Sequence, residues 1–582
     1  MGVRVPEDTK WEPPPPPPLS LLPAAGVFLL SLLLFLCNGR PIGAGDTRVN
    51  EHVAASLAQE GDFDLDEYPL VEPPFAREVG GRRLSVYPVV APLFAAPVFL
   101  ASRMVFALDD AGTAVAGKLA AALLSALAVA LFARAVARRG LGADAVRTAL
   151  LLAAGTGVWA TSQALWQHPA SVLALCAAVL CLVRAEHDDR WAGRAGLPLA
   201  LAVAARHADV ALAGVLAMAL AVRWPRRIPH LLAWAAGPVL FTLAYDAWAF
   251  GAPLRHGFSG TLGRFSEPWG VGHAGLLVSP AKGLLVFTPL AAIAAVGLVR
   301  ALRHEDRRLA LSLGAAVLAH WALIGRWSEW HGGAAWGPRL MTDALPLLFL
   351  FLPEGFQALP KTGAVLAAFS VGVQALGAFA YDGRWERLHQ KGGVPEAAAL
   401  WDPGRSPILF YVQRRVAIVA LPDVRGGRVR VRERRFVLGG QSGSRVHFEG
   451  DGPVVTGAER TIQGLTLERG ARVEAGRAVL SGRWDGVAFS VPEGARPRRL
   501  ELRVAGRGRG LLYVGEDTFW ADAPRWSAYP VAGPFVVRHP YAFAQSGGPE
   551  LSVTVGRGGG EAAIEWLALV APSDPLDPLR LP

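Results

Sequence analysis

The sequence has 582 residues, of which 52% are hydrophobic and 18% charged, and its mean hydropathy is +0.32. The length exceeds that of one ordinary soluble domain, and the hydrophobic fraction exceeds the usual globular range. The formal net charge of +10 does not indicate a nucleic-acid partner, because the arginines lie mostly in short loops between apolar segments, where they orient membrane helices. Together these properties predict an integral membrane protein.

The N-terminal part of the chain combines a polar tail with recurrent apolar runs. Residues 1–18 end in a proline tract and are expected to form a cytoplasmic tail. The run 19–37 is long enough to cross a membrane, and further runs bring the expected number of transmembrane helices to about eleven. The further runs are 113–133, 146–165, 170–184, 195–206, 208–222, 229–249, 283–301, 308–325, 340–353 and 362–381.

The range 195–222 allows either a helical hairpin or one long helix. We favour the hairpin, because Arg206, His207 and Asp209 would otherwise lie at the centre of a membrane span. With this count the arginine clusters all fall on one side of the membrane, which is expected to be cytoplasmic, and the C-terminal part lies outside.

A long first outer loop, 38–112, follows the first span. Residues 47–58 have the spacing of an amphipathic helix, with Val49, Val53 and Leu57 on one face. Residues 87–108 are apolar but contain three prolines, so we expect them to lie at the membrane interface instead of crossing it.

The amino-acid composition changes after residue 381, from long apolar runs to Gly-, Pro- and Arg-rich sequence. A linker at 382–425 is expected to lead into an extracytoplasmic β-sandwich at 426–582, because segments such as "RVRVR", "LELRV", "ELSVTV" and "AIEWLALV" alternate between Gly or Pro turns. Trp484, Trp520 and Trp526 either pack in its core or stack on sugar rings. The three cysteines lie in or beside apolar runs and are expected to be packing residues.

Acidic residues are dense in the first outer loop, beginning with Asp46. Its carboxylate either caps the helix that starts near Thr47 or does chemistry. The acids at 62, 64, 66 and 67 alternate as in a calcium loop but lack its later Gly and Glu, so they are expected to face solvent.

Five segments carry a resemblance to a known family. In chain order they are "GDTRVNEHVAASLAQEGDF", "LSVYPVVAPLFAAPVFL", "AYDAWAFGAPLRHGF", "SPAKGLLVFTP" and "WSEWHGGAAWGPRLMTDALP". This ordered set resembles the GT-C superfamily of polyprenyl-phosphate-sugar glycosyltransferases, which includes protein O-mannosyltransferases and the aminoarabinose transferase of lipid A. The resemblance covers most of residues 20–381.

The resemblance implies a catalytic base in the first outer loop, and Asp46 is the matching position. Asp46 would take the proton of an acceptor hydroxyl, with inversion at the anomeric carbon. A second acid often follows in the family; here Thr47 stands in its place, and Glu51 is the nearest acid. The implied partners are a polyprenyl-phosphate-linked sugar, a lipid, glycan or protein acceptor, and membrane lipids. Some members need a divalent metal ion, but no convincing ligand set is present in this sequence.

Positive charge near the outer membrane surface would stabilise the leaving phosphate. Lys282 and Arg339 lie at the ends of predicted spans, and Arg264 lies in the preceding outer loop. For each boundary residue, snorkelling to the membrane surface is the alternative role.

A tryptophan-rich loop and one histidine complete the candidate site. Trp327, Trp330 and Trp336, with His331, suit sugar stacking or binding of a lipid headgroup, although interfacial aromatic belts look similar. His168 lies at an outer turn and either contacts substrate or caps a helix.

The sequence therefore favours an inverting membrane glycosyltransferase. The alternatives are a transporter or flippase of lipid-linked glycans, which predicts an internal repeat that we do not find, and an inactive GT-C-like binding scaffold.

Overall fold

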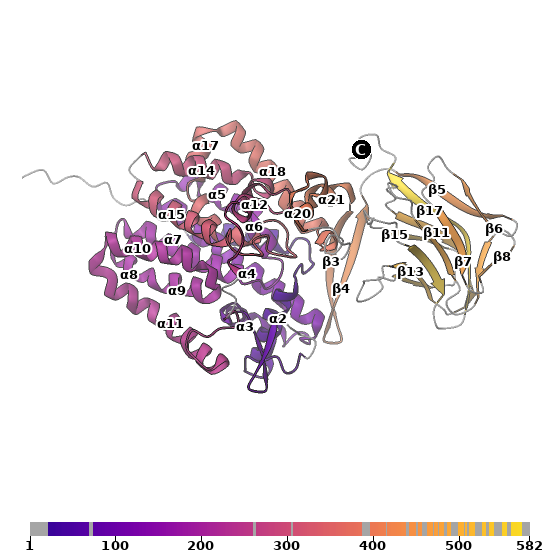
Figure 1. Cartoon of the computed structure of the whole chain (residues 1–582), viewed down its shortest axis with the longest axis horizontal. Helices are drawn as coiled ribbons and strands as arrows, with labels where there is room; N and C mark the ends of the chain where they lie inside the picture. Colours follow the sequence, from indigo (N-terminus) through magenta and orange to yellow (C-terminus); the bar gives the residue numbers. More distant parts are fainter. Residues whose placement is uncertain are drawn as a thin grey trace, which may run out of the picture. The chain divides into compact units, whose positions relative to one another are not determined.

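The computed structural model describes residues 21–68, 74–259, 264–303, 307–386, 396–414 and 416–437, and beyond residue 437 mainly the strands named below (Figure 1). The chain divides into two units. The helical unit is 1–381 with 419–433, and the β-rich unit is 382–418 with 434–582. The proline-rich tail and the tryptophans at 484, 520 and 526 lie outside the described residues.

The first outer loop folds onto the helical unit. It follows α1 (Leu21–Leu36) and contains α2 (Gly45–Gln59), a hairpin of β1 (Ala76–Val79) and β2 (Arg82–Ser85), and α3 (Val90–Ser102). The expected amphipathic helix is confirmed as α2, because Val49 and Val53 are buried in one cluster with Leu65 and Leu84. Packing of this apolar face fixes the direction in which the first turn of α2 points.

Five helices among the described residues are long and apolar enough to cross a membrane. They are α4 (Asp110–Arg138), α7 (His168–Ala185), α11 (Ile228–Phe250) with the turn before it, α15 (Arg307–Ile324) and α18 (Pro360–Ala380). Each coincides with a predicted span. The five helices agree with an integral membrane protein.

The other predicted spans are short or broken, so the expected eleven crossings are not confirmed. The predicted span 19–37 is α1, which has 16 described residues. The helices of the others are α5 (Gly142–Ala154) with α6 (Gly157–Thr161), α9 (Gly196–Ala205), α10 (Val210–Arg223), α13 (Leu284–Phe287) with α14 (Leu290–Ala301), and α16 (Leu345–Phe349) with α17 (Leu352–Ala358). Pro289, Pro346 and Pro353 stand at the starts of such pieces, because proline disrupts a helix interior but fits its first turn.

The range 195–222 forms two helices, not one. The backbone of Arg206 is extended, with φ −153° and ψ 109°, and the 3-10 turn η1 (His207–Asp209) follows it. The break places Arg206 and Asp209 in a turn between α9 and α10, as the hairpin interpretation required.

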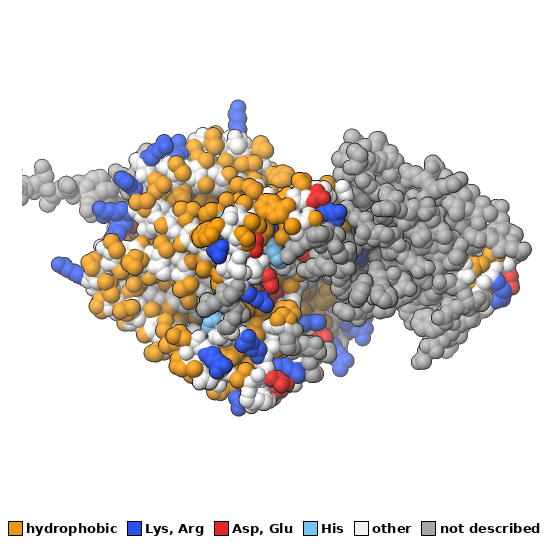
Figure 2. Space-filling view, viewed as in Figure 1, with side chains coloured by type: hydrophobic (Ala, Val, Ile, Leu, Met, Phe, Trp, Pro, Cys, Tyr) orange, Lys and Arg blue, Asp and Glu red, His pale blue; other side chains and the backbone are white. Residues whose placement is uncertain are grey.

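Apolar side chains cover much of the visible face of the helical unit (Figure 2). Several helices expose large apolar residues along one side, including Leu240 and Trp248 of α11, Leu318 of α15 and Phe369 of α18. Contiguous exposed apolar surface on several long helices is typical of contact with lipid.

A β-hairpin from late in the sequence belongs to the helical unit. Its strands are β3 (Val416–Arg425) and β4 (Arg428–Val437). The N–H of Ala420 donates to the carbonyl of Asn38 at 2.8 Å, and the N–H of Ala107 donates to the carbonyl of Gly427 at 2.7 Å. The hairpin therefore ties both ends of the first outer loop.

The β-rich unit contains two larger sheets. One has the order β14-β13-β16-β10-β7, and the other contains β15-β11-β17-β5-β6, with β8, β9 and β12 beside them. The bounds are β5 Gln441–Glu449, β6 Gly452–Thr456, β7 Gln463–Glu468, β8 Arg472–Glu474, β9 Arg477–Leu480, β10 Gly486–Ser490, β11 Arg499–Val504, β12 Arg507–Gly508, β13 Leu511–Asp517, β14 Ser527–Pro530, β15 Phe535–Pro540, β16 Glu550–Val555 and β17 Gly560–Pro572. The alternating segments named from the sequence are strands, whereas the sandwich arrangement stays a prediction. Residues 396–414 add α20 (Glu396–Trp401), η5 (Pro403–Arg405) and α21 (Pro407–Arg414).

Glycines allow a close contact between α14 and α17 in the helical unit. A Cβ atom added at Gly297 would lie 1.8 Å from the carbonyl oxygen of Phe351, and one at Gly355 would lie 2.0 Å from that of Ile293. Two backbones can approach this closely only where neither residue carries a side chain.

We predict that Gly297→Ala lowers the stability of the protein by about 1–3 kcal/mol, because the methyl group would have to displace backbone. The thermal midpoint of the detergent-solubilised protein measures the effect. Gly372→Ala in α18 is the matched control, since a Cβ atom there meets nothing within 4 Å, and it is expected to stabilise the helix slightly. Equal midpoints for the two variants would contradict the packing described.

Candidate active site

Asp46 lies in the first turn of α2. The helix begins at Gly45, and its N-terminal cap is Ala44, which makes no side-chain cap. The side chain of Thr47 holds this first turn instead. Its Oγ1 accepts a hydrogen bond from the N–H of Ala44 at 3.0 Å and donates one to the carbonyl of Ala44 at 2.9 Å. Of the two roles that the sequence allows for Asp46, capping of this helix is wrong, because Ala44 is the cap residue, and the carboxylate of Asp46 contacts another partner.

That partner is Arg339, 293 residues further along the chain. Its Nη1 donates to Oδ2 of Asp46 at 2.5 Å. Its Nε donates to the carbonyl of Gly332 at 2.7 Å, and its guanidinium lies 4.4 Å from the centre of the Trp166 ring. Asp46 and Arg339 side chains are 15% and 18% exposed, so the pair is partly dry and still reachable from outside.

A cavity of about 400 Å³ adjoins Arg339. Its walls include three aromatic rings, those of Trp166, Trp336 and Tyr381, and small residues from α6 and α18. The Trp336 ring is fixed by its N–H, which donates to the carbonyl of Val373 at 3.2 Å, and by ring contacts with Phe287 and Tyr381. A charged pair beside an aromatic cavity is a typical arrangement for a ligand site.

Lys282 supports the loop that carries the tryptophans. Its buried ammonium donates to the carbonyls of Gly333 at 2.9 Å and Ala335 at 2.6 Å. The charges of Lys282 and Arg339 also act on His331. Burial first, and then these two cations, lower the pKa of His331 to about 4. His331 is therefore neutral near pH 7 and adds no charge to the site.

The remaining candidates from this loop lie apart from the ion pair. Trp330 is buried against Gly275 of α12 (Val271–Val278). Trp327 makes an edge contact with Phe265 at 4.9 Å between ring centres. Arg264 is half exposed and lies 3.3 Å from the Glu329 carboxylate.

Glu51 lies inside the protein, between α2 and α4. Its Oε1 accepts from the N–H of Leu165 at 3.3 Å, and its side chain fills the space over Gly117. Burial raises the pKa of Glu51 to about 8, against smaller opposing effects of the Leu165 N–H and Arg48. Leu165 precedes Trp166, so Glu51 supports the residue on which Arg339 rests.

A buried charged cluster lies behind the site. Asp343 belongs to the 3-10 turn η4 (Arg339–Ala344), whose first residue is Arg339. Asp343 accepts from His168 Nδ1 at 2.9 Å and from Arg206, and Arg206 also lies 3.4 Å from Asp209. The cluster ties η4 to α7 and to the turn between α9 and α10. His168 thus contacts Asp343.

Two groups among the described residues present possible metal ligands. Asp209, His320 and Asp343 present ligand atoms within 4.8 Å of one another. However, the Arg206 guanidinium already contacts both carboxylates, and a second cation beside it would be repelled. Asp62, Asp64 and Glu67 form the other acidic group, at the surface. Neither set fits a catalytic ion near Asp46, and no step is assigned to a metal.

Three residues of this region were not singled out from the sequence. Trp166 was visible only as part of "WQHP", and Asp343 as part of "PRLMTDALP". Tyr87 lies before α3, where burial raises the pKa of its hydroxyl above the usual range and the nearby Asp46 carboxylate raises it further. The proximity of Trp166 and Tyr87 to Arg339, and the contacts of Asp343 with His168 and Arg206, depend on tertiary packing, which local patterns do not encode.

The chain was compared with known proteins. No protein-family model and no curated protein matches it. Similar solved structures include ArnT from Cupriavidus metallidurans, with TM-score 0.39, 14% identity and coverage of 64% of this chain and 68% of ArnT. They also include the oligosaccharyltransferase AglB from Archaeoglobus fulgidus in complex with an inhibitory peptide and a dolichol-phosphate, with TM-score 0.35, 12% identity and coverage of 64% and 58%.

A third similar structure is the arabinofuranosyltransferase AftD from Mycobacteria, with TM-score 0.37, 14% identity and coverage of 96% of this chain and 59% of AftD. The chain spans 58% to 68% of the length of these structures. At TM-scores below 0.5 the likeness does not support any assignment of the site, which depends on the geometry above.

We predict that Glu51 makes the protein less stable as pH rises. Since its pKa is about 8 in the folded chain and 4.5 ordinarily, the folded state keeps a proton that the unfolded state loses between these values. Stability from this group falls by about 1.4 kcal/mol per pH unit in that window. Glu51→Gln should flatten the dependence of the thermal midpoint on pH.

Glu60→Gln is the control, because Glu60 is exposed at the end of the same helix, and it should keep the pH dependence of the native chain. Parallel loss of stability in the native protein and Glu51→Gln between about pH 5 and about pH 8 would contradict the buried, protonated state of Glu51.

We predict that Arg206→Met destabilises the helical unit by about 3–5 kcal/mol, since it leaves two buried carboxylates without their shared cation. Arg223→Met is the matched control. It breaks a partly exposed ion pair with Glu186, for which a loss of about 1 kcal/mol or less is expected. Similar losses of thermal stability in the two variants would show that the buried cluster does not hold η4.

Proposed function

We propose that the protein transfers a sugar from a polyprenyl-phosphate carrier to an acceptor hydroxyl on the extracytoplasmic side of the membrane. The observation that supports the proposal most is the Asp46–Arg339 ion pair beside an aromatic cavity, in a unit with five apolar helices. It joins a candidate base to a candidate phosphate ligand, the two groups that glycosyl transfer from a lipid phosphate requires.

Asp46 acts as the general base. The acceptor oxygen forms a bond to the anomeric carbon while its proton passes to the Asp46 carboxylate. The bond between the anomeric carbon and the phosphate oxygen breaks, and its electron pair leaves with the carrier phosphate. Attack opposite the leaving group inverts the configuration. A carboxylate suffices as a base when the transition state resembles an oxocarbenium ion and the proton moves late.

Arg339 binds the leaving phosphate. Its planar guanidinium suits two parallel hydrogen bonds to phosphate oxygens. In the unliganded chain the guanidinium contacts Asp46 instead. Arrival of a phosphate draws Arg339 toward the donor and leaves Asp46 free to accept a proton. The ion pair is thus a resting arrangement that the donor opens.

The other candidates take supporting roles. Lys282 holds the carbonyls of the loop that Arg339 also contacts and adds positive charge near the phosphate. Glu51 positions Trp166 through the Leu165 N–H, and His168 positions η4 through Asp343. Arg264, at the exposed rim, meets the donor before it reaches Arg339.

The aromatic side chains differ in what they offer a substrate. Trp336 lines the cavity next to Arg339 and is the residue that stacks on the sugar or acceptor. Trp330 and Trp327 shape the loop through contacts with Gly275 and Phe265. The β-rich unit lies outside the membrane and holds the acceptor.

We predict that Asp46→Asn reduces transfer about 10²–10⁴-fold, because the amide cannot accept the proton. Membrane vesicles containing the protein, supplied with radiolabelled polyprenyl-phosphate sugars, measure the rate. Arg339→Lys should keep part of the activity and raise the KM for the donor, since an ammonium cannot replace two parallel hydrogen bonds.

Glu60→Gln is the control, because Glu60 is the acid directly after α2. This variant should transfer sugar at the native rate. Transfer by Asp46→Asn at the native rate would remove the proposed base. Movement of the labelled lipid across the membrane without any transfer product would favour a transporter instead.

A further inference from the structure

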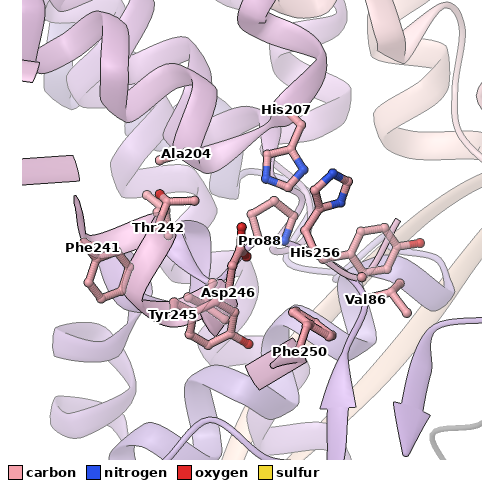
Figure 3. Close-up of a pocket in the computed structure, with 14 residues that line it drawn as sticks. Val86, Pro88, Ala204, His207, Phe241, Thr242, Tyr245, Asp246, Phe250 and His256 are labelled. Atoms are coloured by element: carbon pink, nitrogen blue, oxygen red, sulfur yellow. The ribbon is translucent and has the colours of Figure 1, made fainter. Parts of the chain in front are cut away.

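A second cavity, of about 320 Å³, lies beside α11 and is not used by the chemistry above (Figure 3). Five residues of α11 line the cavity: Phe241, Thr242, Tyr245, Asp246 and Phe250. The opposite side is formed by the segment before α3, by His207 of η1 and by His256, which follows α11.

The carboxylate of Asp246 is buried in this cavity without a partner. Asp246 is 4% exposed, and among the described residues no hydrogen bond or ion pair holds its carboxylate. It stands one turn from the C-terminus of α11, where the helix dipole disfavours negative charge. A buried charge at the end of a lipid-exposed helix is costly, and residues of this kind usually serve a ligand.

Two further polar groups of the cavity also lack partners. The hydroxyl of Tyr245 and Nδ1 of His207 are buried without a hydrogen bond, and Tyr245 is 8% exposed. The rings of His207 and His256 lie 4.5 Å apart. Burial, and to a smaller extent His256, lower the pKa of His207 to about 4. A neutral imidazole both donates and accepts hydrogen bonds, as hydroxyl ligands require.

The walls between these polar groups are aromatic. Phe241, Tyr245, Phe250 and Tyr87 contribute rings. None of the described residues that line the cavity is Lys or Arg, so it does not suit a phosphate, and the unsatisfied carboxylate does not suit an acyl chain. Aromatic faces with a carboxylate, neutral imidazoles and a phenol match a sugar ring, which offers C–H faces and several hydroxyls.

The cavity lies between the lipid-facing side of α11 and the candidate active site. Leu240 and Trp248 of α11 are exposed on the apolar surface, and Phe241, which lines the cavity, is partly exposed beside them. On the inner side, the Tyr87 ring forms part of the wall, and its hydroxyl is close enough to be influenced by Asp46 and Arg339. A lipid-linked sugar arriving from the bilayer would reach this cavity before Asp46.

We propose that this cavity binds the glycosyl group of the lipid-linked donor. The carboxylate of Asp246 accepts hydrogen bonds from the sugar hydroxyls, and the hydroxyl of Tyr245 donates or accepts one. That the bound sugar belongs to the donor rests on the proposed glycosyl transfer. Sugar binding by the cavity is independent of that proposal. The carboxylate accepts from two neighbouring hydroxyls, the imidazoles of His207 and His256 take others, and Phe241 and Phe250 cover the ring faces.

Binding is tested first without any turnover. Saturation-transfer NMR with the full chain in detergent, carrying Asp46→Asn, uses methyl glycosides of common pentoses and hexoses as probes. We expect a signal from at least one glycoside, reduced about tenfold by Asp246→Ala and several-fold by Tyr245→Phe. Leu240→Ala is the matched control, since Leu240 lies on the outer side of the same helix, and it should keep the signal.

Signals that are absent for every glycoside, or equal in Asp246→Ala and the control, would overturn sugar binding. Stoichiometric binding of Zn²⁺ that depends on Asp246, without glycoside binding, would also overturn it and assign a cation to the cavity. Because Asp46→Asn blocks the proposed chemistry, neither result depends on whether the protein transfers sugar.

The donor assignment is tested by transfer kinetics in the native background. Asp246→Ala should raise the KM for the polyprenyl-phosphate sugar about tenfold and leave the KM for the acceptor unchanged. A raised KM for the acceptor with an unchanged KM for the donor would place the acceptor in the cavity and overturn the donor assignment. Transfer by Asp246→Ala at the native rate, with the KM values for donor and acceptor both unchanged, would also overturn the donor assignment.

Discussion

The candidate site depends on one buried interaction, the contact of the Arg206 guanidinium with Asp343. It joins residues 137 positions apart and makes η4 a fixed element. Arg339, at the start of η4, then lies over Trp166 and against Asp46. Since a buried ion pair is expensive to break and contributes little net stability, its value here is positional.

The charged groups of the helical unit fall into two kinds. Those behind the site are mutually neutralised and dry, as in the cluster of Arg206, Asp209 and Asp343. Those facing a cavity keep a route to a ligand: the Asp46–Arg339 pair retains some solvent exposure, and Asp246 has no ion-pair partner among the described residues. Asp246 can accept a ligand without first losing an internal bond, whereas a ligand of Arg339 has to replace its contact with Asp46.

Local patterns were enough to predict part of this structure. The apolar spacing of Val49 and Val53 predicted α2, the cost of burying Arg206 mid-helix predicted the break before η1, and period-two alternation predicted strands such as β11 and β16. For Asp46 and Arg339 the sequence predicted only that both residues lie on the same side of the membrane, and not that they are in contact. The stacking of Arg339 on Trp166 and the contact of Asp343 with Arg206 were not anticipated, because they depend on side chains meeting across folded helices. Apolar runs also could not reveal that prolines and turns divide several spans into short helices.

The hairpin of β3 and β4 has a consequence for how the chain is made. The backbone carbonyl of Asn38 and the backbone N–H of Ala107, early in the sequence, bond to Ala420 and Gly427, and Gly39, with φ +66°, leaves just enough room for the approaching Ala420 carbonyl. During synthesis, therefore, the first outer loop waits for more than three hundred further residues before its own backbone is complete. A chain that ended after α18 would lack Ala420 and Gly427, and the first outer loop would have no contacts with the hairpin of β3 and β4.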